Sequence, residues 1–373
     1  MSDRTPHQPA LGRARRSSRI DDDNPEGARH APNGVERALR QVAAAGAGSR
    51  WAAWLGPLGD RAFVVAEPSP TDAIMLWAGW PSRWRARPGA DDTTCSSCAE
   101  HHGAGIEAPF VEPRRAWRAR VGEAEAACRD GRLNKVVLAR AAAFPAPPGR
   151  AYDVPATVAR LRAAHPDAYV YAFVDGDGCA FVGATPEVLA RLEGRRLRTH
   201  ALAGTAPGDR PQALWSSAKD HREQAWVVEA MCSALGPLAD RVVVAPTPRL
   251  RRAGPLVHLE TPIEAALRPG VTLAQVIDAL HPTPALGGHP RAAARAWLDA
   301  TERLERGAYG GPIGWVGGGG DGLVAVAIRG MLLDGPRAWG FAGAGVVAGS
   351  DPEAEWRETT WKLDAVRSCL VTR

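Results

Sequence analysis

Residues 169–182, YVYAFVDGDGCAFV, decide the fold class of this 373-residue chain. Two apolar segments, Tyr169–Val174 and Cys179–Val182, flank the turn sequence Asp-Gly-Asp-Gly at 175–178. Asp and Gly between two apolar segments predict a β-hairpin. A glycine-rich turn joins two further apolar segments within 313–328. Because the strands come as hairpins rather than singly between helices, the sequence predicts an α+β fold with largely antiparallel sheets.

Outside this hairpin, the sequence predicts one folded domain preceded by a disordered extension. Helices are predicted over residues 113–129, 154–164, 217–236, 272–280, 290–305 and 352–370. Strands are predicted at 51–54, 63–65, 74–77 and 136–139 and on both sides of the turn 193–195, with a loop over 83–112. Residues 1–50 contain no Phe, Trp or Tyr, so we expect them to be disordered. Residues 51–373 are predicted to form the folded domain.

Composition limits the class of protein. Hydrophobic residues make up 45 % of the chain and charged residues 23 %, as in soluble globular proteins. No segment approaches the roughly 18 uninterrupted apolar residues of a transmembrane helix, and no apolar segment follows Met1 as in a signal peptide. The six cysteines are too scattered for a disulfide framework. The sequence therefore predicts a cytoplasmic protein that does not span a membrane.

Lysine is rare in this chain. The 46 basic residues include only three lysines, Lys135, Lys219 and Lys362. Arginine stays protonated in proteins, whereas a buried lysine can lose its proton and act as a base. These lysines are therefore the first candidates for chemistry, although each of them could equally lie on a solvated surface by chance.

Two predicted helices carry acidic residues one turn apart. Glu355 and Glu358 lie at i and i+3 in the last helix, and Asp220 and Glu223 repeat this spacing in an earlier helix. Mg²⁺ usually binds one or two carboxylates together with water and an anionic substrate. The two pairs predict an Mg²⁺ site between the helices, although Glu358 and Lys362 also fit an ordinary i,i+4 ion pair on a solvated face.

Other candidates stand at the ends of apolar segments. Lys135 precedes the apolar residues 136–139, where loss of solvent would favour the neutral amine, a general base. It could instead reach water as an ordinary strand-end lysine. Burial of Glu187 would keep this carboxyl protonated as an acid, unless it is an ordinary strand-edge glutamate. Arg329 follows an apolar strand and could bind a substrate carboxylate. The glycines of 343–345 would let backbone amides approach a ligand closely.

These residues belong to motifs that resemble those of the chorismate-utilising enzymes, and most closely those of the isochorismate synthases. The motifs are NKVVLAR (134–140), GATPE (183–187), LAGTA (202–206), KD (219–220), HPTPALGG (281–288), YGG (309–311), IR (328–329), FAGAG (341–345) and EWRET (355–359). They occur in family order between about residues 113 and 372. The resemblance implies the fold of anthranilate synthase component I, with antiparallel sheets and helices around one cleft.

The resemblance also implies a reaction and a cofactor. The family is Mg²⁺-dependent and acts on chorismate, a dicarboxylate with a ring hydroxyl. Lys135 matches the base that activates water for attack at C2, and Glu187 matches the acid that protonates the departing C4 hydroxyl. Glu223 and Glu358 match the Mg²⁺ ligands, with Asp220 and Glu355 just outside them. The implied activity is that of an isomerase.

The resemblance assigns further residues to substrate binding. Arg329 and Tyr309 match positions that bind the enolpyruvyl carboxylate, and His258 matches a histidine near the ring carboxylate. The complete set of residues at substrate-binding positions is Gly204, Thr205, His258, Ala285, Leu286, Tyr309, Arg329, Gly343, Gly345 and Lys362. The partner implied is chorismate alone, with no nucleic acid and no membrane, in a monomer or weak homodimer.

Departures from the family pattern limit which reaction we expect. Anthranilate synthases typically replace the lysine at Lys135 and recruit a glutaminase, so neither amination nor a glutaminase subunit is expected. Salicylate synthases, which go on to eliminate pyruvate, tend to have Thr where this chain has Ala285. Ala285-Leu286 resembles the members that release isochorismate, and a salicylate synthase remains the alternative. The product could serve siderophore, salicylate or menaquinone biosynthesis.

A different class of protein is suggested by another cluster of residues. Cys95, Cys98, His101 and His102 are zinc-ligand types, and the net charge of the chain is +5. A metal-stabilised nucleic-acid-binding protein is therefore an alternative. However, the four candidate ligands crowd into eight residues of loop composition, and the basic residues are dispersed, so an exposed loop is the better interpretation.

Overall fold

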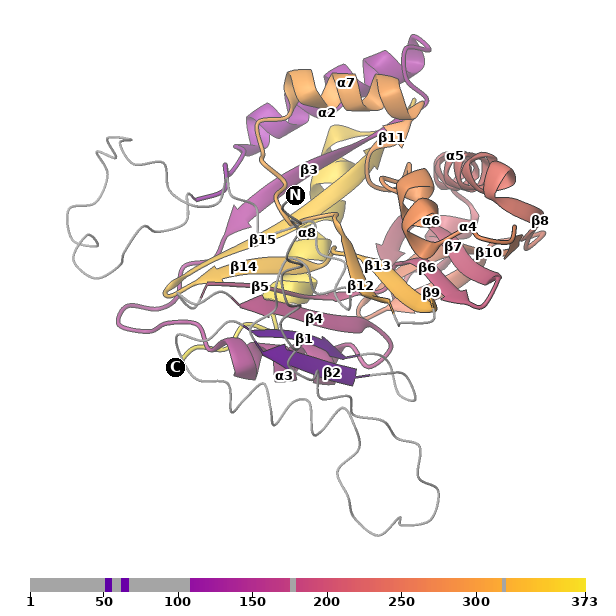
Figure 1. Ribbon diagram of the computed structural model, residues 1–373. Coiled ribbons are helices and arrows are strands. Elements are labelled where there is room, and N and C mark those ends of the chain that lie inside the picture. Colours follow the sequence, from indigo (N-terminus) through magenta and orange to yellow (C-terminus); the bar gives the residue numbers. More distant parts are fainter. Residues whose placement is uncertain (1–50, 56–61, 67–107, 175–178, 317–319) are drawn as a thin grey trace, which may run out of the picture.

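The computed structural model describes residues 51–55, 62–66, 108–174, 179–316 and 320–373 (Figure 1). Several predicted features lie outside the described residues. They are the extension 1–50, the strand 74–77, most of the loop 83–112, the cysteine–histidine cluster at 95–102 and the turn 175–178. Within the described part of the chain, no helix is long and apolar enough to cross a membrane.

The first sheet has eight strands in the order β11-β3-β15-β14-β5-β4-β1-β2. Its strands are β1 (Trp51–Leu55), β2 (Ala62–Ala66), β3 (Lys135–Ala143), β4 (Tyr169–Val174), β5 (Ala180–Thr185), β11 (Gly288–His289), β14 (Gly330–Asp334) and β15 (Arg337–Val346). Strands β4 and β5 pair antiparallel, with Tyr169 opposite Thr185 and Val174 opposite Ala180. This pairing confirms the hairpin from which the fold class was predicted.

The second sheet has seven strands, with β12-β13-β6-β7-β10-β8 in order and β9 paired to β10. Its strands are β6 (Val188–Glu193), β7 (Arg196–Pro207), β8 (Ala239–Val244), β9 (Arg249–Ala253), β10 (Leu256–Leu267), β12 (Pro312–Val316) and β13 (Gly322–Val326). All pairings between the named strands of both sheets are antiparallel. The predicted α+β class with antiparallel sheets is confirmed.

The helices are α2 (Arg114–Arg129), α3 (Val154–Ala164), α4 (Gln212–Trp215), α5 (Ala218–Leu235), α6 (Leu273–Leu280), α7 (Arg291–Thr301) and α8 (Pro352–Arg367). Side-chain caps set where the two acidic helices begin, because Ser217 accepts from the backbone N–H of Asp220 and Asp351 accepts from that of Ala354. Helices α7 and α8 end earlier than predicted. Glu302 leaves the helix because its side chain binds β3, and Thr372 forms a β-bridge with Tyr152.

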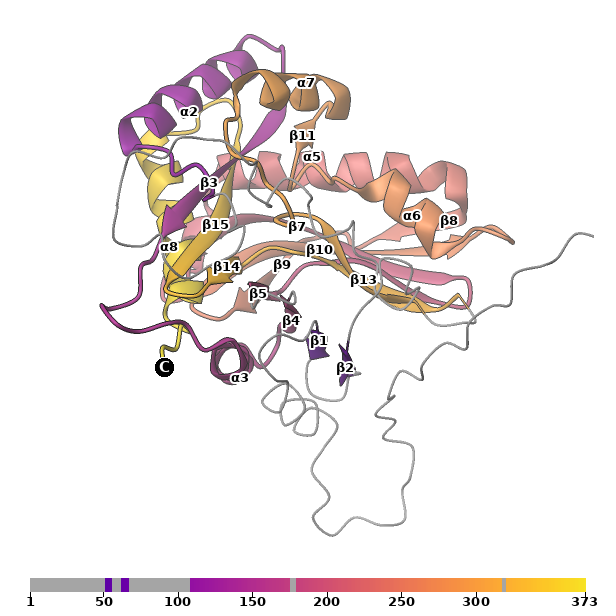
Figure 2. The same cartoon turned by 60° about the vertical axis from the view of Figure 1, so that its left-hand side comes forward.

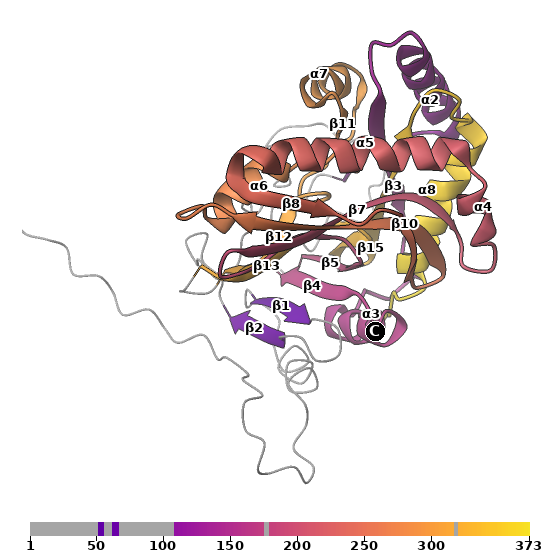
Figure 3. The same cartoon turned by 90° about the vertical axis from the view of Figure 1, so that its right-hand side faces the viewer.

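The two sheets pack on each other, and helices cover their outer faces (Figures 2 and 3). Tyr171, Phe181 and Phe341 of the first sheet share a buried cluster with Ile313 and Leu323 of the second. On the outer side, α3 and α8 pack on the first sheet, and α5 and α6 pack on the second. Helices α2 and α7 cover the end of the first sheet where β3 and β15 lie. This arrangement places α5 and α8 at the junction of the two sheets.

Candidate active site

A pocket lies where the two sheets meet α5 and α8. Its walls come from β3, β7, β10, β15, both helices and the loops that precede β6 and follow β13. The predicted site residues that line it are Glu187, Gly204, Thr205, Glu223, His258, Ala285, Leu286, Tyr309, Arg329, Gly343, Gly345, Glu358 and Lys362. The fold therefore brings together candidates that are spread over residues 187–362.

Lys135 lies directly behind this pocket. It is the first residue of β3, its relative exposure is 0 %, and its Nζ lies 2.9 Å from Oε1 of Glu223. The prediction that this lysine enters a buried strand is confirmed, and the alternative of a strand-end lysine that reaches water is wrong. The absence of a Cβ on Gly345 gives the pair room, since a Cβ there would lie 2.8 Å from Lys135 Cε.

Each of the three lysines forms an ion pair with a glutamate of α5 or α8. Besides Lys135 with Glu223, Lys219 Nζ lies 2.7 Å from Glu355 Oε1. Lys362 Nζ lies 2.6 Å from Glu358 Oε1 and also donates to the carbonyl of Gly343 at 2.8 Å. The predicted i,i+4 pair thus exists, but it faces the pocket instead of forming a solvated face. Each lysine is therefore paired with a glutamate that is at least partly buried.

The pKa values of these carboxyl groups follow from burial and the neighbouring charges. Burial would raise the pKa of Glu223, but Lys135 and Lys219 outweigh it and lower the pKa, so Glu223 is a carboxylate at neutral pH. Burial raises the pKa of Glu355, with the charge of Glu358 acting in the same direction and Lys219 against it. The buried carboxyl groups of α5 and α8 therefore lie close enough that the charge of one shifts the pKa of another.

Glu187 lies between β5 and β6 with its backbone fixed on both sides. Its N–H donates to Thr185 Oγ1 at 3.2 Å, and its carbonyl accepts from the N–H of Val326 at 3.0 Å. Burial raises the pKa of Glu187 to about 7, although Lys135, Lys362 and Arg329 act against the shift. A carboxyl group with this pKa can hold a proton near neutral pH and donate it, as the prediction of an acid requires.

Arg329 and His258 form another part of the pocket wall. Strand β13 ends at Val326, so Arg329 does not end a strand as predicted but lies in the following loop with φ of 53°. A non-glycine residue in this left-handed region is strained and is common at functional sites. Arg329 Nη2 donates to His258 Nε2 at 2.9 Å, so Nδ1 carries the proton and donates to the carbonyl of Gly204 at 2.8 Å. Burial and the charge of Arg329 lower the pKa of His258, which keeps it neutral.

Tyr309 and Phe341 give the pocket an aromatic side. Their rings stack with centroids 5.7 Å apart. Burial raises the pKa of Tyr309 to about 12, so its hydroxyl remains a hydrogen-bond donor. Gly343 allows this approach, since a Cβ at that position would lie 2.9 Å from Tyr309 Oη. Gly343 and Gly345 both belong to β15, so the predicted glycine-rich ligand contact is a central strand of the first sheet.

The residues of α5 and α8 fit an Mg²⁺ ion that is shared with an anionic substrate. Glu223 and Glu358 line the pocket, while Asp220 and Glu355 lie outside its walls. Burial raises the pKa of Asp220, and the charges of Glu223 and Glu358 raise it further, so these groups are neighbours. Among the described residues, no three His, Cys, Asp or Glu side chains form a metal centre by themselves. A cation there would need substrate and water as additional ligands, which is the usual arrangement for Mg²⁺.

Sequence reasoning missed the apolar part of the pocket. The additional lining residues are Val137, Pro186, Leu202, Ala203, Ile328, Phe341 and Ala342. Several of them are neighbours of predicted residues within the same motifs, so the motif boundaries were a usable signal. The apolar character of these residues alone gave no signal, because residues of the same types fill the hydrophobic core.

The family of this chain follows from comparison with known proteins. Residues 93–371 match the family of chorismate binding enzymes, and the chain belongs to this family. Over 268 residues it is 42 % identical to the salicylate biosynthesis isochorismate synthase of Pseudomonas aeruginosa, which covers 70 % of this chain and 56 % of that protein. The chain thus spans little more than half the length of this relative.

Solved structures with the same fold support this assignment. The structure resembles MenF, the menaquinone-specific isochorismate synthase from Escherichia coli, with a TM-score of 0.63 and 30 % identity over 69 % of this chain and 61 % of MenF. It also resembles anthranilate synthase component I from Streptococcus pneumoniae, with a TM-score of 0.61 and 25 % identity over 69 % of this chain and 58 % of that chain. The family and fold inferred from the sequence motifs are confirmed.

Proposed function

We propose that this chain is an isochorismate synthase, an isomerase that converts chorismate to isochorismate. The observation that carries the proposal is that the buried carboxyl group of Glu187 lines the pocket and the buried Lys135 lies directly behind it. The lysine lies behind the wall formed by Glu223, and the glutamate has a pKa of about 7. A base and an acid whose environments differ in this way suit proton transfer in both directions.

In the proposed reaction, Lys135 takes a proton from water as its oxygen attacks ring carbon C2. Both ring double bonds shift, and Glu187 gives its proton to the C4 hydroxyl, which leaves as water. Lys135 then releases a proton and Glu187 takes one up, which restores both groups for the next turnover. One water molecule enters and one departs, so the reaction is an isomerisation without an added oxidant or reductant. Arg329, Tyr309 and Lys362 line the same pocket and provide donors for the substrate carboxylates.

Glu223 and Glu358 would hold the proposed Mg²⁺ ion, with Asp220 and Glu355 next to them. Bound there, the cation would neutralise a carboxylate of the substrate. Replacing Glu223 or Glu358 by Ala should therefore abolish turnover, and so should chelation. Full activity after either change would contradict the metal proposal.

The alternative of a salicylate synthase is not favoured, because the relatives from Pseudomonas aeruginosa and Escherichia coli are named as isochorismate synthases. The two activities differ in their products. Incubation with chorismate and Mg²⁺ should give isochorismate in a reversible reaction, resolved by chromatography. Stoichiometric salicylate and pyruvate as the main products would instead support the alternative and leave the family unchanged. We also propose that the protein acts in the cytoplasm without a glutaminase subunit.

A further inference from the structure

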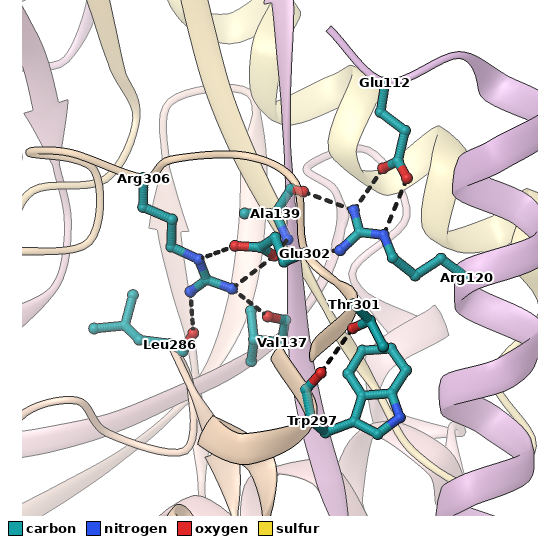
Figure 4. Close-up of polar contacts among 9 residues, drawn as sticks. All are labelled: Glu112, Arg120, Val137, Ala139, Leu286, Trp297, Thr301, Glu302 and Arg306. Atoms are coloured by element: carbon teal, nitrogen blue, oxygen red, sulfur yellow. Dashed lines mark hydrogen bonds and ion pairs between the residues drawn. The ribbon is translucent and has the colours of Figure 1, made fainter. Parts of the chain in front are cut away.

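A buried polar cluster lies against the edge of β3 that faces away from β15 (Figure 4). Its centre is the carboxylate of Glu302, whose side chain is 6 % exposed. Arg306 Nε donates to this carboxylate at 2.6 Å, and Arg120 Nη1 donates at 3.3 Å. Figure 4 shows the two guanidinium groups on either side of Glu302. Glu112 holds Arg120 from the far side, so each buried charge has a partner.

This cluster takes the place of a missing strand. Strand β11 is only two residues long, so most of this edge of β3 has no neighbouring strand within the described part of the chain. Arg306 Nη2 donates to the carbonyl of Val137 at 2.7 Å. The N–H of Ala139 donates to Glu302 at 3.0 Å, and its carbonyl accepts from Arg120 at 3.0 Å. Side chains thus satisfy the buried backbone groups that a strand would otherwise satisfy.

Arg306 also connects the walls of the pocket. Its Nη1 donates to the carbonyl of Leu286 at 2.8 Å, and its own carbonyl accepts from the N–H of Tyr309 at 2.8 Å. Val137, Leu286 and Tyr309 all line the pocket. The guanidinium of Arg306 therefore bonds to two pocket walls from different parts of the chain. The backbone carbonyl of Arg306 holds the third wall, which carries Tyr309.

We infer that Arg306 is a positioning residue that sets the spacing between β3 and the turn carrying Leu286, and thereby the shape of the substrate pocket. It acts through backbone carbonyls and is not among the residues that line the pocket. The planar fork of arginine can donate to Glu302 and to two carbonyls in different directions at once. A lysine could keep the ion pair with Glu302, but its single ammonium would not reproduce this geometry. The inference rests on the proposed function only for the identity of the substrate.

The test compares Arg306→Lys with Arg303→Lys. Arg303 is exposed and lies over the ring of Phe110 at 4.2 Å, so the same substitution there is a matched control. We expect Arg306→Lys to lower kcat/KM for chorismate by about 10- to 100-fold, because small displacements of a binding wall cost this much. The pH profile of kcat should keep its shape, since the acid and the base remain. Arg303→Lys should stay within about twofold of the wild type.

Hydrogen exchange provides a readout that does not depend on activity. The amides of Leu286 and Gly287 both donate to the carbonyl of Thr283. These amides should exchange faster in Arg306→Lys, while those of β15 keep their wild-type rates. Faster exchange throughout the protein, or unchanged exchange at Leu286 with unchanged kcat/KM, would overturn the inference. If the wild type does not convert chorismate but the amides of Leu286 and Gly287 still exchange faster in Arg306→Lys, the inference is supported and the proposed function is refuted.

Discussion

Lys135 is fully buried, and its Nζ forms an ion pair with the carboxylate of Glu223, 2.9 Å away. A lysine in such a place can serve as a fixed positive charge or as a proton acceptor. Arginine can replace lysine in the first role but not in the second. Guanidinium keeps the charge and can bind a carboxylate, but it stays protonated at any working pH. Substitution by arginine therefore separates the two roles.

We expect Lys135→Arg to lower kcat by about 10²- to 10⁴-fold at saturating chorismate, the usual contribution of a general base. Lys219→Arg is the matched control, because Lys219 also pairs with a glutamate but has no assigned proton transfer. It should lose less than about tenfold. Circular dichroism and thermal unfolding would show that both variants fold. Wild-type turnover in Lys135→Arg would rule out the base assignment while leaving the family intact.

The raised pKa of Glu187 links its proposed role as an acid to the stability of the protein. Burial raises this pKa from 4.5 to about 7, so the folded protein holds the proton more strongly than the unfolded chain. The free energy of unfolding should therefore fall as the pH rises from about 4.5 through 7, by on the order of 3 kcal/mol for this group alone. Glutamine resembles the protonated carboxyl group and cannot ionise.

We expect Glu187→Gln to be more stable than the wild type at pH 8, with the difference vanishing at pH 4.5. Urea unfolding at both pH values measures it. The same variant should lose about 10²- to 10⁴-fold in kcat, because it cannot donate a proton. A stability difference that does not change with pH would show that Glu187 does not titrate in this range.

The sequence predicted the charged residues of the pocket better than its apolar lining residues. Three lysines among 46 basic residues stand out, and all three lie in or beside the site. Arg306 could not be found in this way, because arginine is abundant and its role depends on carbonyls of Val137 and Leu286, which are distant in sequence.

Among the elements, β15 decides how closely the sheets approach α5. Gly345 lies in this strand, and a Cβ there would lie 2.2 Å from Oε1 of Glu223. Glu223 is held by Lys135, so neither side chain can move away without breaking a buried ion pair. The strand can pass this point only because residue 345 has no side chain.

We expect Gly345→Ala to destabilise the protein by about 1–3 kcal/mol, the usual cost of overpacking, and to lower kcat/KM by about 100-fold. Gly122→Ala is the control, since Gly122 lies within α2 and a Cβ there meets nothing within 4 Å. It should stabilise the protein by about 0.5–1 kcal/mol, because alanine favours the helix. Urea unfolding and initial rates measure both effects. Equal behaviour of the two variants would contradict the close approach at β15.

Element boundaries were predicted well where local signals exist and less well where distant contacts decide them. The beginnings of α5 and α8 follow from the caps Ser217 and Asp351. The end of α7 depends on Glu302, which leaves the helix to bind the backbone of β3 more than 160 residues earlier in the chain. No local pattern reports such a contact. The same applies to β11, whose two residues are defined only by pairing with β3.

For the whole molecule, the antiparallel two-sheet architecture followed from the hairpins, but the order of strands did not. Strand β3 pairs with β15, about 200 residues later, and this pairing carries Lys135 to the glycines of the last strand. Strand β1 pairs with β4, which connects the beginning of the described chain to the hairpin at 169–185. These long-range pairings depend on sheet packing, which local sequence patterns do not encode.

The pairing of β1 with β4 makes the N-terminal region testable by two deletions. Removing residues 1–45 leaves β1 intact, and the removed segment lacks aromatic residues, so we expect activity within about twofold and an unchanged Tm. Removing residues 1–67 also removes β1 and β2, which leaves β4 as the edge strand among the described strands of the first sheet. This longer deletion should lower Tm and promote aggregation. Initial rates with chorismate and Mg²⁺, thermal unfolding and light scattering measure these outcomes. Loss of activity in the shorter deletion at an unchanged Tm would show that residues 1–45 contribute directly to the pocket.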